Sequence, residues 1–153
     1  MYAAVLFLHS WLRWLVLAAA LVVLIRSLRG WLGSRPWTAT DTSAGRIFTI
    51  VLDVQLLLGL ILYAGLSPIT WAALSDMGAA MRDGLMRYWA VEHAFGMIAA
   101  VVIVHVGLSR ARRASTGIAR HRGVAVSVAV AVLIVLVTMP WPFSSYARPL
   151  LRW

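Results

Sequence analysis

The sequence predicts an all-α integral membrane protein, an up-down bundle of four transmembrane helices that forms a single membrane domain over residues 1–153. The first observation is composition: 62% of the 153 residues are hydrophobic, only 12% are charged, and the mean hydropathy is +0.86. These values are typical of membrane proteins and not of soluble domains. The second observation is a set of four apolar segments, each near the ~20 residues that cross a ~30 Å hydrocarbon layer. The third is the placement of arginine between those segments.

The four segments follow one another along the chain at residues 3–25, 47–66, 88–108 and 124–139. Backbone polar groups in hydrocarbon must be satisfied within the segment itself, so each run is predicted to be a helix. Pro140 ends the fourth segment, because proline lacks the backbone N–H and clashes with the preceding turn. The fourth helix is therefore the shortest of the four.

The segments outside the four spans are predicted to lie along the membrane interface. Residues 67–87 connect the second and third spans, and a short interfacial helix is expected over residues 71–81. Residues 143–153 form a C-terminal tail along the same interface, where aromatic rings favour the headgroup level. Tyr63, at the outer end of the second span, is expected to anchor at the interface too, with a place among the polar residues at the outer ends of the spans as the alternative.

Arginine placement predicts the orientation in the membrane. All 14 basic residues are arginine, and nine of them lie in or beside the first and third loops, against four on the other side. The nine are Arg26, Arg29, Arg35, Arg46, Arg110, Arg112, Arg113, Arg120 and Arg122, and the four are Arg82, Arg87, Arg148 and Arg152. The positive-inside rule then places these two loops in the cytoplasm and both termini in the periplasm of a bacterial inner membrane.

Charge and cysteine content exclude several classes of function. The net charge of +9 does not indicate a nucleic-acid partner, because the arginines lie in short loops and not on a basic helix interleaved with aromatic residues. The expected partners are membrane lipids and other membrane subunits. The absence of cysteine excludes iron–sulfur clusters, thiolate-bound zinc and a covalently attached haem.

Polar side chains inside membrane spans are costly, so each one calls for a reason. An outer layer is predicted from His9 and Arg13 in the first span and from Glu92 and His93 in the third. At 1.5 Å per residue, His9 lies about 25 Å and Arg13 about 20 Å from Arg26, which matches the depth of His93 near the start of its own span.

Three interpretations of this outer layer remain open. In one, His9 and His93 are the axial ligands of one haem iron, while Arg13 or Arg87 pairs with a propionate. In another, Arg13 pairs with Glu92 and the histidines belong to a hydrogen-bonded network that ties two helices together. The third is contact with a quinone or a lipid headgroup.

An inner polar layer is predicted from Asp53, Gln55 and His105, with a hydrogen bond between Asp53 and His105. A second haem is not favoured, because His105 could pair only with His121, which lies in a basic loop where contact with anionic lipid is expected. Met97, one turn after His93, could pack on a porphyrin or act as a weak ligand. Methionine in a helix more commonly fills space.

Four stretches of the chain resemble a family of small four-helix bacterial membrane proteins that are often labelled cytochrome b-like. They are HSWLRWLVL at residues 9–17, QLLLGLILY at 55–63, RYWAVEHAFGMIAA at 87–100 and MPWPF at 139–143. The resemblance implies electron transfer in the membrane through a b-type haem, with His9 and His93 as the positions best placed to ligate it.

These observations predict a small membrane electron carrier within a bacterial energy-transducing complex. The alternative is a cofactor-free accessory or scaffold subunit of a respiratory complex or of a photosynthetic reaction-centre and antenna complex. No independent catalytic activity is expected, because the sequence shows no activated nucleophile and no pair of carboxylates at one depth.

Overall fold

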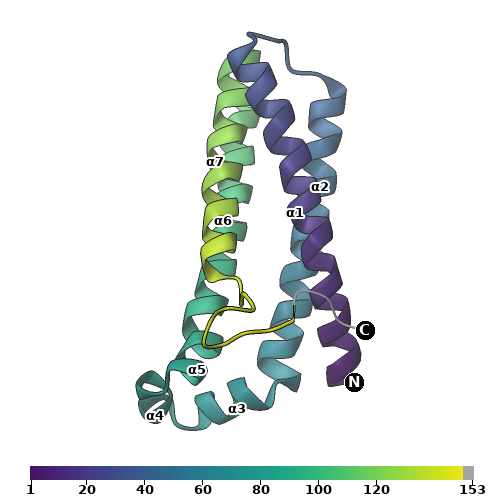
Figure 1. Ribbon diagram of the computed structural model, residues 1–153. Coiled ribbons are helices and arrows are strands. Elements are labelled where there is room, and N and C mark those ends of the chain that lie inside the picture. The colour runs from purple at the N-terminus through teal and green to yellow at the C-terminus, as the bar shows by residue number, and fades with distance from the viewer. Residues whose placement is uncertain (150–153) are drawn as a thin grey trace.

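Four long helices run side by side along the molecule, and three short helices cross one end of it (Figure 1). The computed structural model describes residues 1–149, and within that range every regular element is helical. The four long helices are long and apolar enough to cross a membrane. The elements in chain order are α1 Tyr2–Leu32, α2 Ala39–Ile61, η1 Leu62–Leu66, α3 Pro68–Ser75, α4 Met77–Arg82, α5 Gly84–Arg87, η2 Tyr88–Glu92, α6 His93–Arg112 and α7 Gly117–Thr138.

The long helices alternate in direction, so the molecule has two distinct ends (Figure 1). The loop end carries the short connections at residues 33–38 and 113–116. The terminal end carries the start of the chain, the short helices α3 to α5, and residues 139–149. Helix α1 packs against α2 and α7, and α7 packs against α6, whereas the contact between α2 and α6 is much smaller. The bundle is therefore least closed along its α2–α6 side.

The helices contain the predicted apolar segments and continue beyond most of them. Helix α1 runs through Arg29 to Leu32, and α2 begins at Ala39, so arginines at the loop end lie on helical turns. The single helix predicted over residues 71–81 is instead two helices, α3 and α4. Asp76 separates them, because its carboxylate accepts a hydrogen bond from the Ala79 amide at 2.8 Å and caps a new helix.

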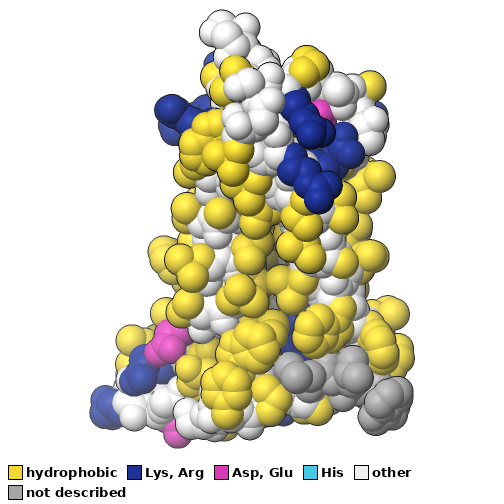
Figure 2. Space-filling view, turned by 45° about the horizontal axis from the view of Figure 1, so that its top comes forward, with side chains coloured by type: hydrophobic (Ala, Val, Ile, Leu, Met, Phe, Trp, Pro, Cys, Tyr) yellow, Lys and Arg dark blue, Asp and Glu magenta, His cyan; other side chains and the backbone are white. Residues whose placement is uncertain are grey.

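Most of the apolar residues of the four long helices lie on the surface of the bundle and not in its interior. In the most apolar 18-residue stretch of each long helix, only 17% to 33% of the residues are buried inside the structure. Hydrophobic side chains cover the middle of the molecule and basic side chains gather near the loop end (Figure 2). A water-soluble domain would bury such helices, so this surface fits a hydrocarbon environment.

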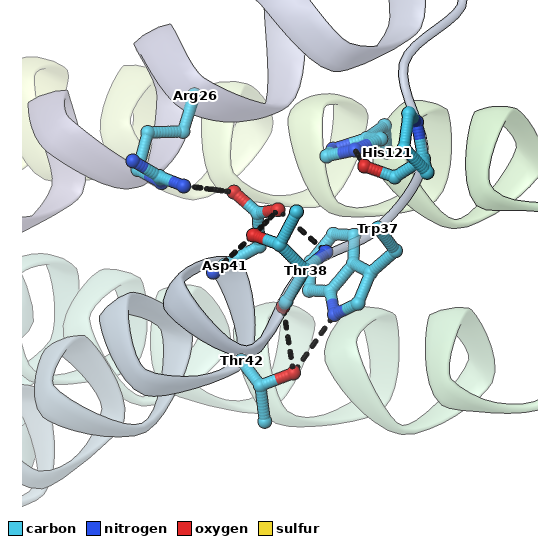
Figure 3. A network of polar contacts seen from close by, with 7 residues as sticks. Arg26, Trp37, Thr38, Asp41, Thr42 and His121 are labelled. Carbon is cyan, nitrogen blue, oxygen red and sulfur yellow. Dashed lines mark hydrogen bonds and ion pairs between the residues drawn. The ribbon is translucent and has the colours of Figure 1, made fainter.

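A polar network closes the loop end (Figure 3). Thr38 caps α2, and Asp41 completes a capping box by accepting hydrogen bonds from the amide and the hydroxyl of Thr38 at 2.9 and 2.6 Å. The same carboxylate, only 7% exposed, pairs with Arg26 of α1 at 2.7 Å. One aspartate therefore fixes the start of α2 and joins it to α1.

His121 is buried in this network, which corrects the prediction that it lies in a solvated basic loop. Helix α7 begins at Gly117, one turn before His121, and directs the ring into the bundle, where it is 1% exposed. The ring centroid lies 4.7 Å from that of Trp37, and Nε2 donates a hydrogen bond of 3.4 Å to the Pro36 carbonyl (Figure 3). Contact with a lipid headgroup is thereby excluded for this side chain.

Candidate cofactor cavity at the terminal end

A cavity of about 420 Å³ lies between the helices at the terminal end. It is lined by His9 and Arg13 from α1 and by His93 and Met97 from α6, so the structure brings the four predicted cofactor residues to one space. The volume is in the range of small-molecule and cofactor sites.

Two π-helical turns shape the walls of this cavity. η1 carries Tyr63 and η2 carries Trp89, and both residues line the cavity. The Tyr63 hydroxyl donates a hydrogen bond of 2.9 Å to the Ala90 carbonyl, which joins the two π turns across the terminal end. Isolated π turns inside α-helices occur frequently at functional sites. Tyr63 thus lies inside the bundle and does not act only as an interfacial anchor.

His93 is held by the last turn of α7. Its Nδ1 donates a hydrogen bond of 2.9 Å to the Thr138 carbonyl, which also accepts one from the buried Tyr88 hydroxyl at 2.6 Å. Carbonyls in the last turn of a helix have no partner within that helix, so these two side chains satisfy one of them. The bond assigns the proton to Nδ1, which leaves Nε2 with a lone pair and no hydrogen bond within residues 1–149.

His9 is held by α2. The Gln55 amide nitrogen donates hydrogen bonds to His9 Nε2 at 3.3 Å and to the His9 carbonyl at 3.1 Å. The imidazole packs over Gly59, where a Cβ would lie 3.2 Å from its Cε1. Gln55 therefore belongs to the outer layer with His9, which corrects its predicted place in the inner layer beside Asp53.

Three residues that line the cavity hold buried polar atoms without a hydrogen-bond partner in the described chain. They are Nδ1 of His9, Oε1 of Gln55 and Nε1 of Trp89. A buried donor or acceptor left unsatisfied costs about 1–3 kcal/mol, so each such group needs an explanation. A polar occupant of the cavity supplies one.

The C-terminal segment folds back over the terminal end and adds a second arginine to the cavity (Figure 1). Tyr146 stacks on Tyr88 with ring centroids 3.5 Å apart, and the Arg148 guanidinium lies 5.1 Å from the centre of the Trp89 ring. Arg148 lines the cavity together with Arg13. The predicted tail of residues 143–153 is described only as far as residue 149, so Arg152 and Trp153 lie outside the described residues.

Glu92 does not take part in the cavity wall. Its carboxylate pairs with Arg87 at 2.8 Å, and both side chains are partly exposed. Glu92 therefore pairs with Arg87 and not with the predicted partner Arg13; Arg87 directly precedes η2 and Glu92 is its last residue.

The predicted contact between Asp53 and His105 is confirmed. His105 Nε2 and Asp53 Oδ1 are 2.7 Å apart, and this pair joins α2 to α6 away from the cavity. Both side chains are about half exposed on the outer surface of the bundle.

The residues that line the cavity fit a haem better than a bare metal ion. Within residues 1–149, no three His, Asp or Glu side chains come together to hold an ion. A haem brings four equatorial nitrogens of its own and needs only axial ligands. His93 offers Nε2, with its Nδ1–H directed at a backbone carbonyl, which is the usual arrangement of a ligating histidine. His9 is less ready to ligate, because Nε2 already meets Gln55.

Comparison with known proteins adds no further constraint. No family model, no curated protein and no solved structure matches this chain.

Proposed function

We propose that this chain is a multi-pass protein of a bacterial inner membrane that binds one b-type haem in the terminal-end cavity and carries electrons within a larger membrane complex. The observation that carries the proposal is a single cavity lined by two histidines and two arginines, in which His93 keeps Nε2 available as a ligand atom. When bound, the haem supplies one-electron chemistry that no side chain of the protein provides.

Each lining residue has a defined part in this proposal. His93 would hold the iron through Nε2, and the Thr138 carbonyl orients the ring through its bond with Nδ1. His9 would be the second ligand if its Nε2 exchanged the contact with Gln55 for the iron. Arg13 and Arg148 would supply positive charge for the two propionates of the haem. The sequence alone predicts only one arginine in this role.

Met97 adds an apolar side chain to the cavity wall that His93 also lines, and it would contact a bound porphyrin there. The proposed orientation places the arginine-rich loop end in the cytoplasm, and the cavity then opens near the periplasmic surface.

A reduced-minus-oxidised absorbance spectrum of the purified protein tests the proposal. We expect a b-type α band from the wild-type chain and its loss in His93→Ala. His105→Ala is the matched control, because His105 lies on the same helix but does not line the cavity. The proposal is wrong if the intact, haem-supplemented protein shows no such band, or if His93→Ala keeps it.

A cofactor-free accessory subunit is the second candidate. It is favoured by the contacts that both imidazoles already make, since His93 bonds to the end of α7 and His9 to α2. In this role His9 fastens α1 to α2 and His93 fastens α6 to α7, and His93→Ala lowers the stability of a protein that holds no pigment. Co-purification of the tagged chain with larger membrane subunits would support the accessory-subunit role.

A further inference from the structure

The pair formed by Asp53 and His105 lies on the outer surface of the helices, at a depth where a lipid chain has no polar atom to offer. Asp53 is 51% exposed and His105 is 47% exposed. At 1.5 Å per residue, Asp53 lies about 10 Å along α2 from Arg46 and about 20 Å from Leu66, where the π turn ends. In the proposed membrane location, this depth is hydrocarbon.

The pair is surrounded by exposed apolar side chains. One turn before and one turn after Asp53, Ile50 and Leu57 are 55% and 57% exposed, and Val102, one turn before His105, is 52% exposed. These residues lie on the α2–α6 side, which is the least closed side of the bundle. They present an apolar face with one polar pair at its centre.

The pair has hydrogen-bonding capacity left over. One bond joins His105 Nε2 to Asp53 Oδ1, while His105 Nδ1 and Asp53 Oδ2 have no partner within residues 1–149. When this contact is an ion pair between a protonated imidazole and a carboxylate, His105 Nδ1 keeps an N–H donor and Asp53 Oδ2 keeps acceptor capacity. A donor and an acceptor left facing hydrocarbon are costly, so polar groups at this depth almost always face protein or enclosed water.

We propose that a second copy of this chain covers the α2–α6 side and forms a two-fold symmetric dimer around this pair. The proposal rests on the membrane location given above, and it does not depend on haem. A two-fold axis beside the pair places the partner's Asp53 against His105 and the partner's His105 against Asp53. The leftover donor of each copy then meets the leftover acceptor of the other, which is the self-complementarity that an isologous interface requires. An unrelated helix would need a matching donor and acceptor at the same depth.

Cysteine cross-linking in native membranes tests this interface. The chain has no cysteine of its own, so each variant carries a single reactive thiol. Leu57→Cys and Val102→Cys place the thiol beside the pair, whereas the controls Leu21→Cys on α1 and Leu133→Cys on α7 place it on the opposite side at similar exposures of 56% and 62%. We expect disulfide-linked dimers from the first two variants after mild oxidation and none from the controls.

Removing the polar pair separates a specific dimer from random collision. In the double variant Asp53→Leu with His105→Leu, the chain keeps its apolar surface but loses both inter-copy bonds. The loss of two hydrogen bonds between transmembrane helices corresponds to a dissociation constant about tenfold higher. Energy transfer between labelled copies in lipid vesicles measures this change.

Three results would overturn the proposal. They are equal cross-linking at the test and control positions, a monomer at all lipid dilutions, and an unchanged dissociation constant in the double variant. Carbonate extraction of the same membranes tests the membrane location separately, so a failure of the interface is distinguishable from a failure of that location.

Discussion

The contact between His121 and α1 offers the sharpest test of packing in this bundle. His121 is 1% exposed, and its ring lies against the backbone of α1 at Gly30. A Cβ added at Gly30 would overlap Nε2, Cδ2 and Cε1 of the ring. Because the imidazole also contacts the Trp37 ring and the Pro36 carbonyl, a shift of the ring away from Gly30 would disturb both contacts. We therefore expect Gly30→Ala to destabilise the protein.

The expected magnitude follows from two opposing effects. Adding a methyl group to a closely packed contact costs about 1–3 kcal/mol. Replacing glycine by alanine in a helix gains up to about 1 kcal/mol, with less near a helix end such as this one. The net loss in the free energy of unfolding is therefore about 1–2 kcal/mol.

Gly45→Ala is the matched control for this prediction. Gly45 also lies within a long helix, but a methyl group added there would meet its nearest atom, Cδ2 of Leu108, at 3.5 Å, an ordinary contact distance. That variant should be neutral or more stable by up to about 1 kcal/mol. Unfolding in mixed micelles with increasing SDS, followed by circular dichroism, measures both variants.

A second measurement shows whether the ring causes the loss. His121→Ala combined with Gly30→Ala should cost less than the sum of the two single changes, because the shortened side chain leaves room for the methyl group. If Gly30→Ala is as stable as Gly45→Ala, or if the two changes simply add, the close approach of α1 to His121 is not as described.

Three further variants test hydrogen bonds that close the ends of the bundle. Tyr88→Phe removes one of the two donors to the Thr138 carbonyl and should lower the free energy of unfolding by about 1 kcal/mol. An unchanged unfolding midpoint would exclude a role for that hydroxyl. Thr38→Ala should cost about 1 kcal/mol as a lost helix cap. Asp41→Ala should cost more, about 2 kcal/mol, because the same buried carboxylate also binds Arg26. Equal losses in these last two variants, measured by the same unfolding assay, would show that the contact with Arg26 adds nothing.

Some features of the site could be predicted from spacing along single helices. His9 and Arg13 are four residues apart, as are His93 and Met97, so each pair shares a helix face, and all four line the cavity. The bond between Asp53 and His105 was predictable from depth, because both residues lie in the half of their predicted apolar segments, 47–66 and 88–108, that is nearest the loop end.

Other features of the site depend on contacts that single-helix spacing does not report. Gln55 pairs with His9 and lies apart from Asp53, because side chains two residues apart on a helix point to different sides. His121 is buried because α7 begins at Gly117, seven residues before the apolar segment at 124–139. Hydropathy alone therefore placed His121 in a loop. Arg148 reaches the cavity only because the C-terminal segment folds back across the terminal end, and nothing in its local sequence indicates that turn.

Hydropathy and proline placement are enough to specify the four apolar helices and their alternation, because both act locally along the chain. Which polar side chains meet is set by packing between segments far apart in the sequence. The rotation of each helix about its axis, the two π turns and the path of residues 139–149 determine which side chains are in contact. A cavity is bounded by several helices at once, so its lining follows from their mutual packing and not from the period of any one of them.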